Sequence, residues 1–140
     1  GIADRVEFIQ QVPNSKIQAY YERADVFLMA THYEGFCIPV LEAMAAGLPV
    51  IASDTGPIPE VLGGTGWVVN KDSEAFTESL SKLADDRGRR AAMGRAARER
   101  ALEIDGPIME KRECAIYRAL LNSDETDLDQ MLSEKRRYVN

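Results

Sequence analysis

The sequence predicts an α/β fold in which a parallel sheet is flanked by helices and the C-terminal part is helical. Three observations support this prediction. Short apolar segments alternate with segments of helical periodicity as far as Asn70. Two of the apolar segments, VFLMA and PVIAS, are continuous, which is typical of strands buried on both faces of a parallel sheet. Three successive segments of helical character then follow.

The first half of the chain is predicted to alternate strands with helices. Pro39 suits the first turn of a helix, where its missing N–H costs nothing, and Gly47 is a typical helix end. The predicted elements are, in order, a strand over Arg5–Val12, an amphipathic helix over Lys16–Ala24, a strand over Val26–Ala30, a helix over Pro39–Ala46 and a strand over Pro49–Ser53.

The second half begins with a loop rich in glycine and proline over Asp54–Gly64, which includes one helical turn at Ile58–Leu62. Residues 123–140 carry acidic and then basic side chains, and we expect a polar tail or solvated helix there, outside the single domain formed by residues 1–122. The other predicted elements are a strand over Gly66–Asn70 and helices over Ser73–Ala84, Arg87–Leu102 and Pro107–Leu121.

Composition and charge exclude several classes of protein. The chain has 140 residues, of which 45% are hydrophobic, so it can bury the core of one domain. Its net charge of −6 argues against a nucleic-acid binder, which needs a basic face. No apolar run approaches the roughly 18 residues of a membrane span, and no signal segment opens the chain. We therefore expect a cytoplasmic protein, with the inner membrane surface as the alternative location.

The cysteines and the single histidine predict no metal site. Cys37 and Cys114 are far apart in the sequence, and together with His32 they cannot supply a zinc ligand set. We expect both cysteines to be reduced thiols of a cytoplasmic protein. The chain opens at Gly1 with residues typical of the interior of a protein, so we expect a fragment of a longer chain.

The segment EGFCIPVLE predicts an anion site with a carboxylate on either side. Glu34 follows the predicted strand Val26–Ala30, and ligands of parallel sheets bind at the carboxyl ends of strands. The turn at residues 35–38 leads into a helix whose first N–H groups lack internal partners, which suits a phosphate or diphosphate. Glu42, predicted in the first helical turn, can accept two ribose hydroxyls, and Glu34 can hold hydroxyls of a second sugar. These features together indicate a nucleotide diphosphate sugar.

The residues of this segment resemble the donor-binding signature of the retaining glycosyltransferases with the GT-B fold, specifically family 4, the group 1 glycosyltransferases. The flanking segments ADRVEFIQQVP, YYERADVFLMAT and IASDTGPIPEVLGGTGWVV agree with the family in order and spacing, and the resemblance extends from Gly1 to Tyr117. It implies that residues 1–122 are part of a Rossmann-like, nucleotide-sugar-binding domain in the C-terminal part of the GT-B fold. The matching residues are Glu34, Gly35, Phe36, Pro39, Glu42, Ala43, Gly47, Pro49 and Val50.

The resemblance also implies roles for these residues. Glu42 binds the ribose, and Glu34, as the catalytic residue, contacts the donor sugar and gives positioning and electrostatic support rather than acting as a base. Configuration is retained, with the leaving diphosphate assisting attack by the acceptor. The acceptor is a sugar, a lipid-linked group or a small molecule held by an N-terminal domain, and no metal or cofactor is expected. The implied donor-binding residues are Glu34, Gly35, Phe36, Cys37, Ile38 and Glu42, the turn residues acting through backbone amides.

The sequence departs from the family pattern at Cys37, in the loop Thr31–Tyr33, at Asp105–Pro107 after Ile104, and in the parts of the fold that it lacks. Cys37 stands where glycine is usual, so it is strained if its φ is positive and otherwise only narrows the pocket. The N-terminal domain and the first two strands of the C-terminal domain are absent from these residues. We therefore expect the chain to be inactive alone, with its first strand displaced, paired with another chain through an exposed sheet edge, or poorly ordered.

Two interpretations remain open for several loop residues. His32 either is solvated or packs in the loop, or it contacts the donor. Ser53, Asp54 and Thr55 either hydrogen-bond the loop or contact the ligand. Glu60 either holds the following loop through backbone N–H groups or binds the ligand.

Two interpretations also remain for the arginines and aromatic residues, and for the function. The arginines between Arg87 and Arg100 form either a solvated helix face with ion pairs or a contact with a membrane surface. Tyr20, Tyr21 and Trp67 either pack in the core and its rim or stack on the base. The rival functions are a nucleotide-sugar 2-epimerase of the same architecture, whose acid and base residues are not found here, and a sugar-nucleotide-binding module without catalysis.

Overall fold

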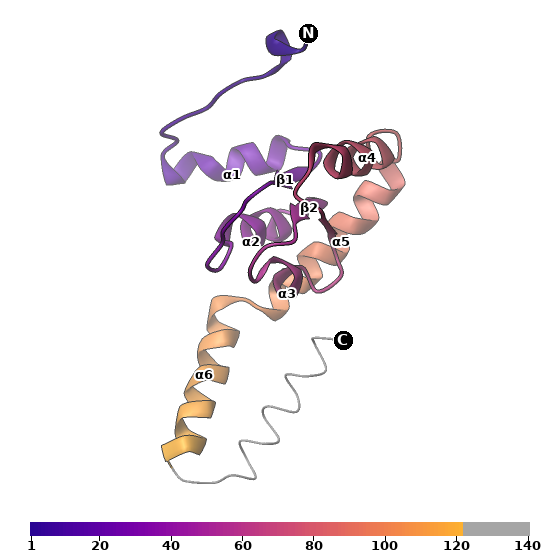
Figure 1. Ribbon diagram of the computed structural model, residues 1–140. Coiled ribbons are helices and arrows are strands. Elements are labelled where there is room, and N and C mark those ends of the chain that lie inside the picture. Colours follow the sequence, from indigo (N-terminus) through magenta and orange to yellow (C-terminus); the bar gives the residue numbers. More distant parts are fainter. Residues whose placement is uncertain (122–140) are drawn as a thin grey trace.

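The computed structural model describes residues 1–121 of the chain, shown in colour in Figure 1, so the polar tail predicted for residues 123–140 lies outside the described residues. Helices and strands alternate through the first half, and three helices complete the described chain. The elements are η1 (Ala3–Arg5), α1 (Asn14–Arg23), β1 (Phe27–Met29), α2 (Ile38–Ala45), β2 (Val50–Ser53), α3 (Ile58–Leu62), β3 (Trp67–Val69), α4 (Ser73–Ala84), α5 (Arg87–Glu103) and α6 (Gly106–Leu121).

The three strands form a parallel sheet in the order β1-β2-β3. All of β2 is buried, because it has a neighbour on each side. The prediction that the segment Val26–Ala30 is buried on both faces is wrong, since Leu28 in β1 is 43% exposed. Within the described chain β1 is an edge strand, so one side of its backbone lacks a strand partner.

Helices cover both faces of the sheet. Val50 and Ala52 of β2 join the main apolar core, in which α2, α3 and α5 supply most of the other side chains. Ile51 is equally buried but points to the opposite face, because side chains alternate along a strand. On that face α4 contacts β2 and β3, and it buries Leu83.

The closest helix contact joins α5 to the end of α2. Gly94 of α5 is buried, and a Cβ added to it would overlap the carbonyl oxygen of Gly47. Gly47 follows α2 with a φ of +77°, which glycine adopts without steric cost. Two glycines therefore allow the backbones of α2 and α5 to touch.

The N-terminal segment does not join the sheet. The prediction of a strand over Arg5–Val12 is wrong, because no strand forms there and residues 1–11 are exposed. Phe8 is 90% exposed, and Figure 1 shows the segment extending away from the body of the molecule. An isolated strand leaves its backbone groups without partners, and β1 pairs with β2 alone. Of the three outcomes expected for this segment, the structure shows displacement from the sheet.

Candidate functional site

The segment with the predicted site residues connects the carboxyl end of β1 to α2. Its start is fixed at Thr31 by hydroxyl groups from the last residue of β2 and from the segment that follows it. The Thr31 N–H donates to Ser53 Oγ at 3.0 Å, and the Thr31 carbonyl accepts from Ser53 Oγ at 2.9 Å and from Thr55 Oγ1 at 2.9 Å. Ser53 and Thr55 are buried and hydrogen-bond the loop, which was one of the two interpretations open for them.

Glu34 lies in this loop with its carboxylate turned toward the backbone of the following turn. Its Oε1 accepts from the N–H of Gly35 at 3.1 Å and from the N–H of Cys37 at 3.0 Å. The side chain therefore holds the shape of the turn that was expected to contact sugar and phosphates. A carboxylate that accepts two backbone N–H bonds is fixed in orientation, which a positioning role requires.

Gly56 supports the same loop and was missed by the sequence reasoning. It has a φ of +52°, and a Cβ built on it would lie 2.6 Å from the carbonyl oxygen of Glu34. Only glycine allows this approach without shifting the loop. The sequence signal was a glycine just past a predicted strand, in the stretch Asp54–Pro57.

Cys37 adopts the strained conformation that was one of its two expected states. It precedes α2 with φ 66° and ψ 50°, in the left-handed region. Its side chain is 1% exposed, with Sγ 3.3 Å from Met29 Sδ. Burial raises the pKa of the Cys37 thiol above its ordinary value, an effect partly opposed by the backbone N–H of Val40. This thiol therefore belongs to the core.

Glu42 lies one residue further along α2 than predicted, just past the first turn. The helix begins at Ile38, so Glu42 is its fifth residue and no acidic residue occupies the first turn. The interaction of its charge with the helix dipole is correspondingly weaker than expected, since the effect is concentrated in the first turn. Its side chain is exposed, and its Oε2 accepts a hydrogen bond from Tyr21 Oη at 2.9 Å.

Tyr21 itself was predicted only as a packing or stacking residue. Its ring packs against Phe27, with centroids 5.9 Å apart, at the edge of the core. Burial and the bond to Glu42 raise the pKa of Tyr21 to about 12. Tyr20, the next residue, is 44% exposed and Trp67 is half-buried.

The remaining residues of the turn face solvent. Phe36 is 56% exposed and Ile38 is 60% exposed. Within the described chain, the backbone N–H groups of Phe36 and Ile38 have no hydrogen-bond partner in the protein. Donors of this kind at the start of a helix are available to an anion. His32 is also exposed, as expected for one of its two interpretations.

The short helix α3, which follows β2, is held by Arg100, whereas the Glu60 side chain does not hold the loop. Arg100 of α5 donates from Nη2 to the Glu60 carbonyl at 3.1 Å and from Nε to the Val61 carbonyl at 3.4 Å. Its Nη1 also pairs with Glu103 at 3.0 Å. The prediction that Glu60 holds the loop by accepting backbone N–H groups is wrong, since Glu60 contributes its carbonyl oxygen instead.

The other arginines divide between structural bonds and solvent. Arg90 donates from Nη1 to the carbonyl oxygens of Leu83 at 2.5 Å and Ala84 at 2.7 Å, where α4 ends. Arg89 pairs with Asp86 at 3.4 Å, while Arg95 and Arg98 are exposed. The arginines of α5 therefore do not form one uniform solvated face.

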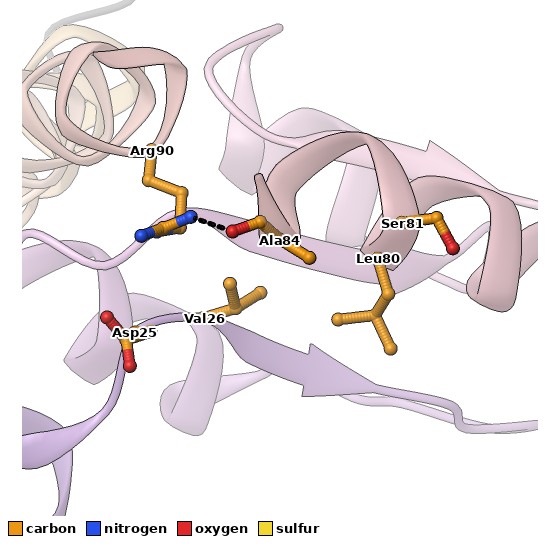
Figure 2. A pocket seen from close by; sticks show the side chains of 6 residues that line it. All are labelled: Asp25, Val26, Leu80, Ser81, Ala84 and Arg90. Atoms are coloured by element: carbon orange, nitrogen blue, oxygen red, sulfur yellow. Dashed lines mark hydrogen bonds between the residues drawn. The ribbon is translucent and has the colours of Figure 1, made fainter. Parts of the chain in front are cut away.

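A hollow of about 330 Å³ lies at the opposite end of β1 from the predicted site. Figure 2 shows Arg90 with its bond to Ala84 above Asp25 and Val26, which directly precede β1. None of the predicted site residues lines this hollow. It is lined by Asp25, Val26, Leu80, Ser81, Ala84 and Arg90.

The described chain shows neither a membrane-spanning helix nor a metal-binding group of side chains. None of its helices has the length and apolar character needed to cross a bilayer. No group of three or more His, Cys, Asp or Glu side chains in residues 1–121 is arranged to hold a metal ion.

Two curated relatives indicate where the chain falls among known sequences. A GDP-mannose-dependent alpha-(1-6)-phosphatidylinositol monomannoside mannosyltransferase from Mycolicibacterium smegmatis is 39% identical over 113 residues, covering 74% of this chain and 30% of that protein. A D-inositol 3-phosphate glycosyltransferase from Streptomyces avermitilis is 38% identical over 104 residues, covering 72% of this chain and 22% of that protein. The chain thus spans less than a third of the length of these relatives.

Solved structures agree with the sequence comparison. Sucrose-phosphate synthase from Thermosynechococcus elongatus matches 88% of this chain and 32% of its own with a TM-score of 0.77 and 28% identity. The C-terminal domain of a glycosyl transferase group 1 family protein from Francisella tularensis matches 69% of this chain and 50% of its own, with a TM-score of 0.60 and 30% identity. These likenesses confirm the predicted α/β, GT-B-type fold class. The family described as Glycosyl transferases group 1 matches residues 1–100. The chain belongs to the group 1 glycosyltransferases.

Proposed function

We propose that the chain is the donor-binding part of a retaining glycosyltransferase, which moves a sugar from a nucleotide diphosphate sugar to an acceptor hydroxyl. The observation that carries this proposal is the turn from Glu34 to Ile38, where a fixed carboxylate and two unpartnered backbone N–H groups meet the start of α2. Its place in the C-terminal half of a longer enzyme is supported by the match to a glycosyltransferase C-terminal domain.

The diphosphate of the donor is proposed to bind the turn itself. The N–H groups of Phe36 and Ile38 are free within the described chain, and the helix start adds a favourable dipole. Glu34 keeps the turn in shape through its bonds to Gly35 and Cys37, and its negative charge is proposed to face the hydroxyls of the donor sugar. Its proposed role is to position the sugar and support it electrostatically.

The ribose is proposed to bind Glu42. This carboxylate is exposed, and within the described chain its Oε1 has no protein partner. An ionised carboxylate has several acceptor sites, so it can take two vicinal hydroxyls while Oε2 also accepts from Tyr21. No metal is needed for these contacts, and none is proposed.

Partners follow from the same proposal. The acceptor, whether a sugar, a lipid-linked group or a small molecule, would bind a part of the enzyme outside this chain, so the chain alone is proposed to be inactive. Arg87, Arg95 and Arg98 are exposed and provide the remaining basis for a peripheral membrane contact. The free edge of β1 is the proposed site of self-association.

A 2-epimerase is not favoured, because the relatives described above are named as glycosyltransferases.

The first test is calorimetric titration with GDP, UDP and ADP of the chain and of the natural full-length protein that contains it. GDP comes first because one relative is named as GDP-mannose-dependent. We expect one nucleotide to bind the full-length protein and to bind the chain weakly or not at all. Absence of binding in both would contradict the donor site and leave the two glutamates as structural residues, whereas binding without turnover in the full-length protein would favour the module without catalysis.

Two substitutions in the full-length protein separate the roles of the glutamates. Glu42→Ala is expected to weaken nucleotide binding by about 1–3 kcal/mol through the ribose. Glu34→Ala is expected to lower turnover more than nucleotide affinity, while Glu34→Gln, which keeps an acceptor for the two backbone N–H groups, controls for the shape of the turn. If turnover falls mainly with Glu42 and nucleotide affinity mainly with Glu34, the two roles are exchanged.

A further inference from the structure

Within the described chain, Tyr21 is the residue whose side chain hydrogen-bonds the Glu42 carboxylate. The two residues are separated by 21 positions and lie on different helices, α1 and α2. The Tyr21 hydroxyl donates to Glu42 Oε2 at 2.9 Å and also lies 3.5 Å from the Pro39 carbonyl oxygen. The hydroxyl is therefore directed at one oxygen of the carboxylate, close to the start of α2.

The ring of Tyr21 is fixed from behind by the sheet. It packs against Phe27 of β1 with an interplanar angle of 41°, and both residues pack against the main core cluster. A tyrosine ring has only two rotatable bonds, so this packing largely sets the position of its hydroxyl. The glutamate, in contrast, is exposed and has a longer chain with more freedom.

We propose that Tyr21 is a positioning residue that fixes the Glu42 carboxylate for the vicinal hydroxyls of a nucleotide ribose. The inference rests on the proposed function, since it assigns the ribose to Glu42. The bond to Tyr21 occupies Oε2 on one side and leaves Oε1 to accept from the ligand. Binding then costs less rotational entropy, because the carboxylate is already oriented.

The protonation state of the phenol supports the role. Burial, and then the hydrogen bond to Glu42, raise the pKa of Tyr21 to about 12. The phenol therefore keeps its proton through the neutral range, and the hydroxyl stays a donor to the carboxylate. Within the described chain, the group that faces this hydroxyl most closely besides Glu42 is the Pro39 carbonyl, which can only accept.

The test compares Tyr21→Phe with Tyr20→Phe in the full-length protein. Tyr21→Phe keeps the ring against Phe27 and removes only the hydroxyl, while Tyr20→Phe removes an exposed hydroxyl from the same helix. Binding of GDP and of 2′,3′-dideoxy-GDP is measured by calorimetry for each variant. We expect Tyr21→Phe to weaken GDP binding by about three- to tenfold and to leave the dideoxy nucleotide unchanged. Tyr20→Phe is expected to change neither.

A double-mutant cycle separates positioning from a general effect on structure. If Tyr21 acts through Glu42, then Tyr21→Phe in a Glu42→Ala background causes no further loss of GDP affinity. A loss that persists in that background, or that is equal for both nucleotides, would overturn the inference. So would GDP binding by Tyr21→Phe that is as tight as that of the unmodified protein, or tighter.

If the proposed function is wrong, the affinities for GDP and its dideoxy analogue give a different result. An unmodified protein that binds GDP and its dideoxy analogue equally would contradict the assignment of the ribose to Glu42, and the Tyr21 inference would fall with it. An unmodified protein that discriminates between them, together with an unaffected Tyr21→Phe variant, would overturn the Tyr21 inference alone. UDP and ADP with their dideoxy analogues replace GDP if calorimetry shows that one of them is the nucleotide bound.

Discussion

At the scale of single residues, side-chain oxygens determine the shape of the loop after β1. Ser53 binds both backbone groups of Thr31, and Glu34 binds the N–H groups of Gly35 and Cys37. The sequence predicted Glu34 and Glu42 as site residues from their spacing around a turn and a helix start. It could not predict the Tyr21–Glu42 bond, because this contact depends on how α1 packs against β1.

Cys37 is expected to react slowly with thiol reagents. Its side chain is buried and its thiol pKa is raised by that burial, whereas Cys114 is exposed. Since the thiolate is the reactive form, iodoacetamide at pH 8 should alkylate Cys114 first. Mass spectrometry of peptides from timed reactions measures both rates, with Cys114→Ser as the control. Equal rates for the two cysteines would show that the turn opens in solution.

The free energy of unfolding is expected to depend on pH through Tyr21. Its pKa is raised from 10.0 to about 12 in the folded protein, so the unfolded chain loses this proton first. The contribution of protonated Tyr21 to the free energy of unfolding is complete below pH 10 and is lost as the pH rises from 10 toward 12. The free energy of unfolding, measured with urea at pH 9, 10 and 11, should therefore fall more steeply with pH for the unmodified protein than for Tyr21→Phe. These values lie around the ordinary tyrosine pKa of about 10. If the free energy of unfolding changes with pH in the same way for both proteins, the raised pKa of Tyr21 is contradicted.

At the scale of elements, the boundaries of the helices and of the three strands agree with the prediction to within two residues. The bounds predicted for α4 agree with the structure because Asp72 caps it, accepting from the Ala75 N–H at 2.8 Å. Asp86 caps α5 in the same way through the Arg89 N–H. These signals are local and can be seen in the sequence. The burial of β1 could not be predicted, because it depends on which strands and helices become its neighbours.

The contact between α2 and α5 predicts opposite effects for two glycines of α5. Gly94→Ala places a Cβ on the Gly47 carbonyl oxygen and is expected to destabilise the fold by about 1–3 kcal/mol or more. Gly88→Ala, where an added Cβ would meet nothing closer than Asp86 Oδ1 at 3.4 Å, is the matched control. It should be neutral or stabilise by up to about 1 kcal/mol through helix propensity. Chemical denaturation of both variants measures the change in the free energy of unfolding. If Gly94→Ala leaves this free energy unchanged, α2 and α5 separate readily to make room for the added Cβ.

At the scale of the whole molecule, the described sheet ends in two edge strands, β1 and β3. Among the described strands, β2 has two neighbours, and β1 presents a free edge. The apolar residues Val6, Phe8 and Ile9 favoured a strand by local preference, and they are exposed in extended chain. Strand formation depends on a partner from elsewhere in the fold, so local sequence preference gave the wrong element here.

Deletion of residues 1–11 is expected to leave the free energy of unfolding unchanged within about 0.5 kcal/mol, because the segment is exposed and bonds only locally. Denaturant unfolding of the shortened and complete chains measures this difference. Phe27→Ala, which removes a ring packed on the core, is the destabilising reference. A loss comparable to that reference would show that the segment packs against the body in solution.

The anchoring of Thr31 also limits how the loop can move. The loop is fixed at its start by the hydroxyls of Ser53 and Thr55, and at its end by the buried Cys37 and the first turn of α2. Both anchors are buried, so we expect backbone rotation to be confined to residues 32–36. An adjustment of Glu34 to a ligand would therefore be a small-amplitude rearrangement between two fixed points, and it would not be transmitted into the sheet.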